Sequence, residues 1–301
     1  MGCKCCQKAW GLEDIGDLKG KTIIVTGGNS GLGFYTALAL GEAGAEVIIA
    51  CRDKVKGQAA LEKLQKSASS GLFKLEILDL ADQESIANFA NRFLALNKPL
   101  DILVNNAGVM APPKREVTTK GFELQFATNH LGHFALTGLL LPALKRSQKP
   151  RVVVVSSLVA FWGKINFNDL QSNLSYNPMQ AYGQSKLANL DFMLELGKKA
   201  PWLTCVAAHP GASITNLQRY SKPSKIFVKL LGQEAEKGAL PTLLACVDDV
   251  SSGTFYGPKG CLQLKGSPKI KRLPCRARNT AEHEKLWAIS EDLTKIKYDF
   301  S

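Results

Sequence analysis

The sequence predicts an α/β protein built on one doubly wound parallel sheet with helices on both faces. Short runs rich in Val, Ile and Leu alternate along the chain with longer segments of helical periodicity. Most of the short runs are continuously apolar, which is typical of strands that are buried on both faces in a parallel sheet. The first run, residues 22–26, leads through a glycine-rich turn into a helical segment, and such units build doubly wound sheets.

Six strands are expected up to residue 208, and the pattern is less regular after it. The strands are 22–26, 46–50, 73–78, 100–104, 151–156 and 204–208. The helices between them are 33–43, 54–67, 83–96, 121–146 and 179–198. Two further helices are expected at 234–247 and 280–295. Because crossovers between parallel strands are right-handed, the helices are expected to cover both faces of the sheet.

No repeat or linker divides the chain, so residues 19–301 are interpreted as one domain that follows a tail, residues 1–18. Hydrophobic residues make up 45% of the 301 residues, enough for one large core. Ligands of such sheets bind beyond the carboxyl ends of the strands. The irregular region after the sixth strand, about 212–247, is therefore expected to form a substrate lid.

The composition argues against membrane-spanning and secreted classes. No apolar stretch reaches the roughly 18 residues of a membrane span, and the longest candidate, 131–144, contains Gly, His and Pro. The N-terminus lacks the apolar run of a secretory signal. Five of the eight cysteines are scattered without regular spacing. Reduced thiols in a cytoplasmic protein are therefore expected rather than a disulfide framework.

The net charge of +12 is unevenly distributed. Between Lys259 and Arg278 the chain has seven Lys or Arg residues and no Asp or Glu. Such a run is either a solvated loop or a surface that meets an anionic partner. Because nothing else resembles a nucleic-acid-binding module, no nucleic acid is expected, and peripheral contact with the cytoplasmic face of a membrane is the preferred alternative. The sequence also allows a homo-oligomer.

The run T-G-G-N-S-G-L-G at 26–33 lies between the first strand and the first helix. A glycine turn in this position presents backbone N–H groups and a helix N-terminus to a phosphate group. Glycine suits the turn because a Cβ would obstruct the bend or the approach of the ligand. The spacing differs from the G-x-G-x-x-G fingerprint, so the prediction of a dinucleotide site rests on the strand and helix around it.

Tyr182 and Lys186 are four residues apart in a helical segment, which places both on one face. A tyrosine has a pKa of about 10, too high for ready proton transfer at neutral pH, and a nearby ammonium is expected to lower it. The pair is therefore a candidate general acid or base at a carbonyl or an alcohol. Tyr176 competes for this role, but position 180 is Gln, so Tyr176 lacks a lysine partner.

Polar residues end two other buried runs. Ser156 and Ser157 follow the apolar residues 152–155, and the turn N-N-A-G at 105–108 follows the run before it. Asn129 lies in the helix after that turn. Each of these residues could serve only as a turn or cap residue. That alternative does not explain why they collect at the carboxyl edge of the predicted sheet, where ligands bind.

These motifs occur in order over about residues 20 to 215, and together they resemble the classical-type short-chain dehydrogenase/reductase family. They are TGGNSGLG at 26–33, Asp79 in LDL, NNAG at 105–108, Asn129 in NHLGHF, Ser157, Tyr182-x-x-x-Lys186 and Pro210-Gly211. ACRD at 50–53, NHLGHF at 129–134 and the 25-residue spacing from Ser157 to Tyr182 resemble the retinol dehydrogenase-like branch. The resemblance implies a Rossmann-type fold and an oxidoreductase.

The resemblance also implies roles. Tyr182 would exchange a proton with the substrate oxygen. Lys186 would lower the pKa of Tyr182 and bind the nicotinamide ribose. Ser157 would polarise the substrate oxygen, and Ser156 is the second choice for this role. Asn129 would hold a water that relays protons past Lys186, and the hydride comes from the cofactor. Asp79 would contact the adenine. The implied cofactor-binding residues are Gly27, Asn29, Ser30, Gly31, Leu32, Gly33, Arg52, Asp79, Leu80, Asn106, Ala107, Gly108, Tyr182, Lys186, Pro210 and Gly211.

The end of the second strand bears on cofactor choice. An arginine there accommodates the 2′-phosphate of NADP, whereas an acidic residue binds the ribose 2′-hydroxyl of NAD. Arg52 therefore favours NADP (NADPH), and Asp53 directly after it leaves NAD as the second choice. Residues 158–162, Met110 and residues 226–231 are expected to form an apolar pocket or to pack in the core.

Such a pocket suits a lipophilic substrate of the retinoid, steroid or fatty aldehyde type. Two alternatives remain: a catalytically silent dinucleotide-binding protein that senses redox state, and a reductase of the protochlorophyllide type. The intact Asn129, Ser157, Tyr182 and Lys186 argue against the first, and no feature of the sequence favours the second.

The first six residues, M-G-C-K-C-C, resemble the start of proteins that are myristoylated at glycine and palmitoylated at cysteine. Cys6 departs from the myristoylation motif, which has Ser or Thr at that position. One acyl chain binds membranes only marginally, so a second chain or the basic residues would be needed. A plain unstructured tail is the alternative. No metal site is expected, because the cysteines have no fourth ligand nearby.

Overall fold

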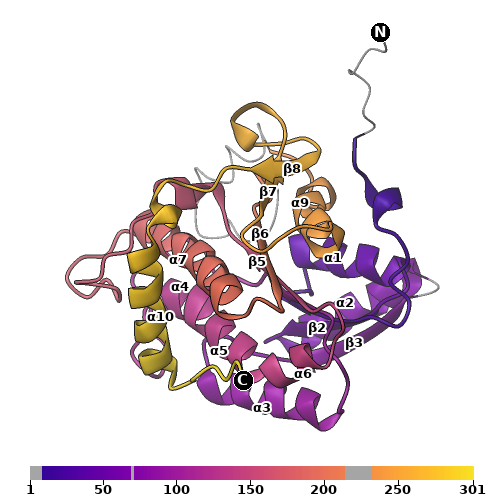
Figure 1. The fold of residues 1–301 in the computed structure, drawn as a ribbon, viewed down its shortest axis with the longest axis horizontal. Coiled ribbons are helices and arrows are strands. Elements are labelled where there is room, and N and C mark those ends of the chain that lie inside the picture. Colours follow the sequence, from indigo (N-terminus) through magenta and orange to yellow (C-terminus); the bar gives the residue numbers. More distant parts are fainter. Residues whose placement is uncertain (1–8, 69–70, 214–231) are drawn as a thin grey trace.

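The computed structural model describes residues 9–68, 71–213 and 232–301. Its strands are β1 (Thr22–Thr26), β2 (Glu46–Cys51), β3 (Leu72–Ile77), β4 (Ile102–Asn105), β5 (Arg151–Val155), β6 (Thr204–Ala208), β7 (Phe255–Pro258) and β8 (Pro268–Lys271). They form one sheet in the order β3-β2-β1-β4-β5-β6-β7-β8. Neighbouring strands are parallel except β7 and β8, which form an antiparallel hairpin at one edge (Figure 1).

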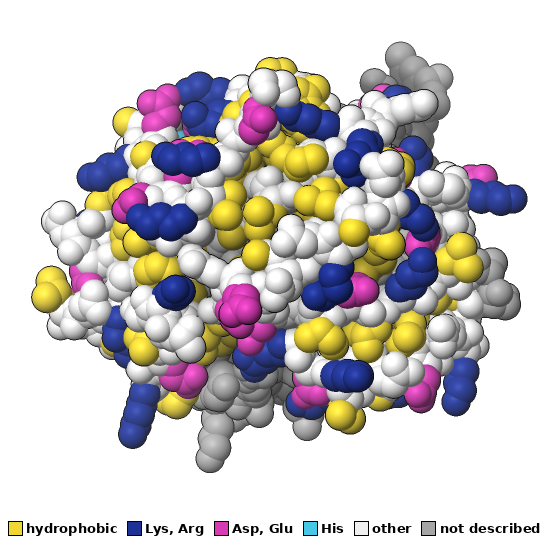
Figure 2. Space-filling model, turned by 90° about the horizontal axis from the view of Figure 1, so that it is seen from below, with side chains coloured by type: hydrophobic (Ala, Val, Ile, Leu, Met, Phe, Trp, Pro, Cys, Tyr) yellow, Lys and Arg dark blue, Asp and Glu magenta, His cyan; other side chains and the backbone are white. Residues whose placement is uncertain are grey.

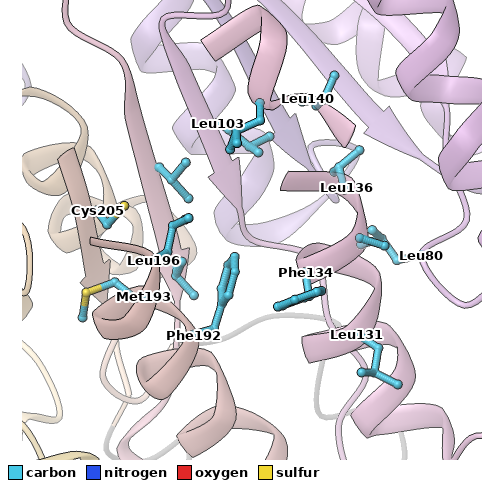
Figure 3. Packing of buried hydrophobic residues seen from close by; sticks show 14 of the residues in the cluster. Leu80, Leu103, Leu131, Phe134, Leu136, Leu140, Phe192, Met193, Leu196 and Cys205 are labelled. Atoms are coloured by element: carbon cyan, nitrogen blue, oxygen red, sulfur yellow. The ribbon is translucent and has the colours of Figure 1, made fainter. Parts of the chain in front are cut away.

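Helices cover both faces of the sheet. The main ones are α1 (Gly31–Glu42), α2 (Lys54–Ser67), α3 (Gln83–Ala95), α5 (Gly132–Leu139), α7 (Pro178–Lys199), α9 (Ala235–Val247) and α10 (Thr280–Thr294). In β1, Ile24 belongs to a buried cluster with side chains of α3, α5, α7 and α10, whereas Ile23 and Val25 belong to another with α1, α2 and α9. In the first cluster, Phe134 and Phe192 face each other with ring centroids 5.6 Å apart (Figure 3). The predicted doubly wound sheet is confirmed.

The carboxyl ends of the central strands lie at one edge of the sheet. Thr26 at the end of β1 is in register with Ala50, and Asn105 at the end of β4 is in register with Val154. The chain moves from β1 outward to β2 and β3, then returns to place β4 on the other side of β1. Such a reversal of strand order leaves a crevice at the carboxyl edge, where ligands of open α/β sheets bind.

Two local predictions differ from the structure. The single helix expected at 121–146 is divided into α4 (Leu124–Phe126), a π-helical turn η2 (Ala127–Leu131), α5, and α6 (Leu141–Lys145). In η2 the Gly132 N–H donates to the Ala127 carbonyl, one residue further back than in an α-helix. Strands β7 and β8 were not predicted, because they are short and contain Gly and Pro residues that are uncommon inside strands.

Part of the predicted tail and lid, residues 1–8 and 214–231, lies outside the described residues. Residues 235–247 of the predicted lid form α9, whose Ala239 and Leu243 are buried against the sheet. In the described part of the tail, Ile15 is buried in the same cluster. Among the helices of the described residues, none is both long enough and apolar enough to cross a membrane.

Candidate active site

The glycine turn joins β1 to α1 at the carboxyl edge. Gly27 has a φ of 67°, a conformation that favours glycine. A Cβ on Gly33 would lie 2.5 Å from the Gly27 carbonyl oxygen, so the first turn of α1 packs directly on the glycine turn. Ser30 at the N-cap makes no side-chain capping bond, and the first turn has no acidic residue. The backbone N–H groups of this turn are therefore suited to bind an anion such as a phosphate.

A cleft of about 940 Å³ begins at the glycine turn. Predicted cofactor-binding residues that line it are Gly27, Asn29, Ser30, Gly31, Leu32, Gly33, Arg52, Asp79, Leu80, Asn106, Ala107 and Gly108. Small-molecule sites have volumes of about 300–1,000 Å³, so this cleft has room for an extended ligand. Its uncapped helix N-terminus and glycine-lined wall fit the pyrophosphate of a dinucleotide. Tyr182, Lys186, Pro210 and Gly211 are not among the described lining residues.

Thr26, the last residue of β1, holds the glycine turn against the N-N-A-G turn. Its Oγ1 accepts hydrogen bonds from the backbone N–H groups of Asn106 and Ala107, each at 2.9 Å. The side-chain amide of Asn106 donates to the Thr26 carbonyl at 2.7 Å. These bonds fix two neighbouring walls of the cleft. Thr26 was not predicted as a site residue, because its partners lie about 80 positions further along the chain.

Asn129 is buried in the π-helical turn. Its Oδ1 accepts a hydrogen bond from the Val109 N–H at 2.8 Å, and its Nδ2 donates to the Val109 carbonyl and to Ser185 Oγ. His133 Nδ1 lies 2.9 Å from the Asn129 carbonyl oxygen, and His133 Nε2 lies 2.9 Å from Thr26 Oγ1. Burial lowers the pKa of His133 to about 4, so the ring is neutral at pH 7. Its proton is assigned to Nδ1, because a carbonyl oxygen can only accept.

Ser157, Tyr182 and Lys186 meet at the carboxyl end of β5. Ser157 follows β5 and caps a short 3-10 turn, η3 (Leu158–Phe161). Its hydroxyl interacts with the phenol of Tyr182 on α7, and this interaction acts to lower the pKa of the phenol. One turn further along α7, Lys186 Nζ lies 5.9 Å from the centroid of the Tyr182 ring and donates to the Val155 carbonyl at 3.0 Å. The structure therefore brings Ser157 together with Tyr182 and Lys186, which the sequence places in a separate motif.

Burial decides the pKa values of this group. Tyr182 and Lys186 are each 3% exposed. Burial raises the pKa of Tyr182 to about 12, although the hydrogen bond with Ser157 acts in the opposite direction. Burial also lowers the pKa of Lys186 to about 8. The sequence predicted a lowered pKa for Tyr182, and the structure gives the opposite direction because desolvation of the phenolate outweighs its stabilisation.

Neighbouring residues of the same types have other roles. The Ser156 hydroxyl is buried and donates to the Lys186 carbonyl at 2.7 Å, which joins β5 to α7 and leaves Ser157 as the serine at the site. The Tyr176 hydroxyl donates to the Pro112 carbonyl at 2.9 Å. The sequence already set Tyr176 aside, because position 180 is Gln, but it kept Ser156 in reserve.

Pro210 and Gly211 follow β6 at the same edge of the sheet. Gly211 has a φ of 68°, and its N–H donates to His209 Nδ1 at 3.2 Å. His209 Nε2 then donates to Gln263 Oε1 at 2.9 Å, since burial lowers the pKa of His209 to about 4 and keeps the ring neutral. The turn is thus supported from the loop between β7 and β8, and sequence reasoning gave no signal for Gln263.

An open sheet that places a buried tyrosine and lysine beside a dinucleotide-sized cleft defines a nicotinamide-dependent oxidoreductase. Residues 21–225 match the family described as short chain dehydrogenase, and the chain belongs to that family. It is therefore an oxidoreductase that acts on CH–OH or C=O groups. The family resemblance and the Rossmann-type fold predicted from the sequence are both confirmed.

The chain is similar to several retinol dehydrogenases. It is 40% identical to retinol dehydrogenase 12 of Mus musculus over 94% of this chain and 89% of that protein. It is 38% identical to retinol dehydrogenase 11 of Homo sapiens over 94% of this chain and 88% of that protein. Both matches extend well beyond the motifs, into the C-terminal part of the chain.

Solved structures show the same fold. An uncharacterized protein from Mycobacterium Paratuberculosis superposes with a TM-score of 0.83 at 38% identity, over 97% of this chain and all 100% of that chain. The complex of Pseudomonas aeruginosa RhlG with NADP superposes with a TM-score of 0.64 at 24% identity, over 79% of this chain and 94% of that chain. At that identity the second similarity supports the fold alone.

Proposed function

We propose that the chain transfers a hydride between NADP(H) and a lipophilic alcohol or carbonyl compound of the retinoid, steroid or fatty aldehyde type. The main supporting observation is that α7 buries Tyr182 with Lys186 Nζ 5.9 Å from its ring, while Ser157, which interacts with the Tyr182 phenol, follows β5. This group lies at the carboxyl edge of the sheet, where the glycine turn opens into the large cleft. One bound substrate can therefore reach both the proton-exchanging group and the bound dinucleotide.

When bound, the nicotinamide dinucleotide supplies or accepts the hydride. With a pKa of about 12, Tyr182 holds its proton at neutral pH and can donate it to a carbonyl oxygen during reduction. Ser157 donates a hydrogen bond to the same oxygen and polarises it. Lys186, with a pKa of about 8, is mostly an ammonium at pH 7 and binds the nicotinamide ribose. Asn129 holds the water that returns a proton to the site.

The preference for NADP is inferred from the residues after β2. Arg52 is exposed and lines the cleft together with Lys56 and Lys63. The carboxylate of Asp53 accepts a hydrogen bond from the Lys56 N–H at 3.0 Å and pairs with the Lys56 ammonium at 2.9 Å. Asp53 also lines the cleft, but its carboxylate is paired with Lys56 at the start of α2, whereas Arg52 and Lys63 line the cleft as further cations. This charge distribution favours a 2′-phosphate over a 2′-hydroxyl.

Replacing Arg52 with Ala tests the cofactor preference. We expect the KM for NADPH to rise at least 10-fold, on the order of the loss of one charge-assisted contact, and the KM for NADH to change little. Steady-state kinetics with both cofactors measure the two values. A wild-type chain with the lower KM for NADH would contradict the preference.

The apolar surroundings of Ser157 support a lipophilic substrate. Leu158 and Phe161 lie in η3 directly after it, Trp162 is 74% exposed, and Met110 lines the cleft. Few polar groups and several large apolar side chains are typical of pockets for hydrophobic ligands. The predicted pocket residues 226–231 lie outside the described residues. The names of the retinol dehydrogenases to which the chain is similar make a retinoid the first compound to test.

Oxidation of NADPH in the presence of retinal, a steroid ketone and a series of fatty aldehydes tests the proposed function. We expect Tyr182→Phe to lower kcat by about 10²–10⁴-fold, because it removes the general acid. Tyr176→Phe is the matched control and is expected to retain kcat, because Tyr176 bonds to the Pro112 carbonyl. Equal turnover by the wild type and Tyr182→Phe would refute the mechanism. Binding of NADPH without turnover of any compound would favour the catalytically silent alternative.

We also propose that the N-terminal tail, residues 1–18, is acylated at Gly2 and at a nearby cysteine and holds the protein at the cytoplasmic face of a membrane. The basis is the M-G-C-K-C-C sequence, which lies within residues 1–8, outside the described part of the chain. Metabolic labelling with a myristate analogue tests the proposal, with Gly2→Ala as the control. Absence of label on the wild-type chain would refute it.

A further inference from the structure

The loop between β7 and β8 projects from the edge of the sheet (Figure 1). Backbone hydrogen bonds close this loop: the Lys259 N–H donates to the Ser267 carbonyl at 2.7 Å and the Gly260 N–H donates to the Lys265 carbonyl at 3.0 Å. We call the exposed part of the hairpin the hairpin surface. Its residues are Lys259, Leu262, Lys265, Lys269 and Ile270.

Apolar side chains of the hairpin surface point to solvent. Leu262 is 76% exposed and Ile270 is 54% exposed. Leu262 and Gln263 both adopt positive φ angles, 52° and 57°, which are unfavourable for residues with a Cβ. The backbone is therefore strained at Leu262 itself, whose side chain is exposed, and such strain is often associated with a binding function.

The hairpin surface is also strongly basic. Its three lysines belong to the run 259–278, and among the described residues no carboxylate forms an ion pair with any Lys or Arg of that run. The pKa of Lys271 is lowered by partial burial and by the positive charge of Lys269, as expected where cations lack acidic neighbours. On the face seen from below, by contrast, Lys and Arg are dispersed among Asp and Glu (Figure 2).

Hydrogen bonds connect the hairpin to the carboxyl edge where substrate binds. The Ala212 N–H donates to the Leu264 carbonyl at 2.8 Å, and the Gly266 N–H donates to Gln233 Oε1 at 3.1 Å. Further along the basic run, Arg276 donates to the Gly163 carbonyl at 2.7 Å, directly after the exposed Trp162. The hairpin is therefore bonded to the segment that follows β6 at the carboxyl edge, and the end of the basic run is bonded to the segment that follows β5.

We propose that the hairpin surface binds a bilayer that contains anionic lipids. Lysines beside an exposed leucine suit a lipid surface, because the ammonium groups meet anionic headgroups while Leu262 enters the apolar region beneath. A nucleic acid would match the charge but would leave the Leu262 side chain in water. The proposal goes beyond the proposed reaction, and binding to vesicles can be measured whether or not the chain turns over any substrate.

Cosedimentation of the unacylated full-length chain with vesicles tests this proposal. We expect binding to phosphatidylcholine vesicles with 30% phosphatidylserine, much weaker binding to phosphatidylcholine alone, and release as salt rises. The triple variant Lys259→Glu/Lys265→Glu/Lys269→Glu is expected to bind about 100-fold more weakly, from the attraction of each lysine to an anionic surface. Leu262→Ser is expected to bind about 10-fold more weakly, because it removes the apolar insertion.

The matched control is Lys66→Glu/Arg146→Glu/Lys149→Glu, which makes the same change in net charge at exposed residues outside the hairpin. We expect this control to lose less than 3-fold in binding. Thermal unfolding and NADPH binding show that each variant is folded. Equal losses in both triple variants, undiminished binding by the hairpin variant, or equal binding to uncharged vesicles would overturn the proposal. Hairpin-dependent binding of duplex DNA that displaces the vesicles would also overturn it.

Discussion

Burial of Lys186 predicts an unusual dependence of stability on pH. The pKa of this lysine falls from 10.5 to about 8 in the folded chain. Between these two values the unfolded chain binds more protons than the folded one, so the free energy of unfolding rises with pH. The penalty for burying the ammonium is complete below about pH 8 and disappears as the pH rises through 10.5. The full difference corresponds to about 3 kcal/mol.

The measurable part of this effect lies between pH 7 and pH 9.5. For the two pKa values of Lys186, linkage gives a gain of about 2 kcal/mol over that interval. Other groups also titrate there, among them Cys205 and Cys246, whose pKa values are raised by burial. A Lys186→Met variant keeps these other groups and a side chain of similar length but has nothing to titrate at this position. The difference between wild type and variant therefore isolates Lys186.

Urea unfolding at pH 7.0, 8.0, 9.0 and 9.5 measures the free energy of unfolding for both chains. We expect the wild type to gain about 2 kcal/mol relative to Lys186→Met between the lowest and the highest pH. The variant should also be the more stable of the two at pH 7, because it no longer buries an ammonium. A wild-type-minus-variant difference that stays constant within about 0.5 kcal/mol would show that Lys186 does not titrate with a lowered pKa, and would refute the reasoning.

Four other substitutions separate roles within the site. Ser157→Ala should lower kcat by about 10²-fold and leave the free energy of unfolding almost unchanged. Ser156→Ala should instead lower the free energy of unfolding by about 1 kcal/mol, because the hydrogen bond to the Lys186 carbonyl is lost. Steady-state kinetics and urea unfolding distinguish the two variants. Gly108→Ala should weaken dinucleotide binding, measured by fluorescence titration, because its Cβ would lie 3.1 Å from Asn129 Oδ1 at the wall of the cleft. His133→Phe should destabilise the chain by about 2–3 kcal/mol, since the Asn129 carbonyl and the Thr26 hydroxyl lose a buried partner; unchanged urea unfolding would contradict this.

The central part of the fold was predictable because its signals are local. Most of the first six strands are apolar runs, which predict burial on both faces of a parallel sheet, and β1 is buried along its whole length. The hairpin was not predictable in the same way. Strand β7 is the tetrapeptide F-Y-G-P, and β8 begins with Pro268, so their pairing is decided by the edge of an existing sheet rather than by their own composition.

The candidate site likewise contains residues that the sequence could predict and residues that it could not. Ser157, Tyr182 and Lys186 were identifiable because their types and spacing have a chemical meaning. Thr26 and His133, which support the glycine turn and Asn129, were not, because the hydrogen bond between them joins distant segments of the chain. The second histidine of N-H-L-G-H-F offered one usable signal. In a helix it lies one turn after Asn129, within reach of the Asn129 carbonyl.

The protonation states also depend on packing, which the sequence does not encode locally. The spacing alone predicted a lowered pKa for Tyr182. The helix instead buries Tyr182 and Lys186 in the core, where burial favours the neutral form of each side chain. At pH 7 the phenol, with a pKa of about 12, is almost entirely protonated, and the lysine, with a pKa of about 8, is mostly charged. A protonated phenol is the state from which a carbonyl is reduced, whereas oxidation of an alcohol requires the proton to be removed first. With its proton in place, Tyr182 can act as the general acid of the proposed reduction at neutral pH, and a rise in pH should favour the proposed oxidation.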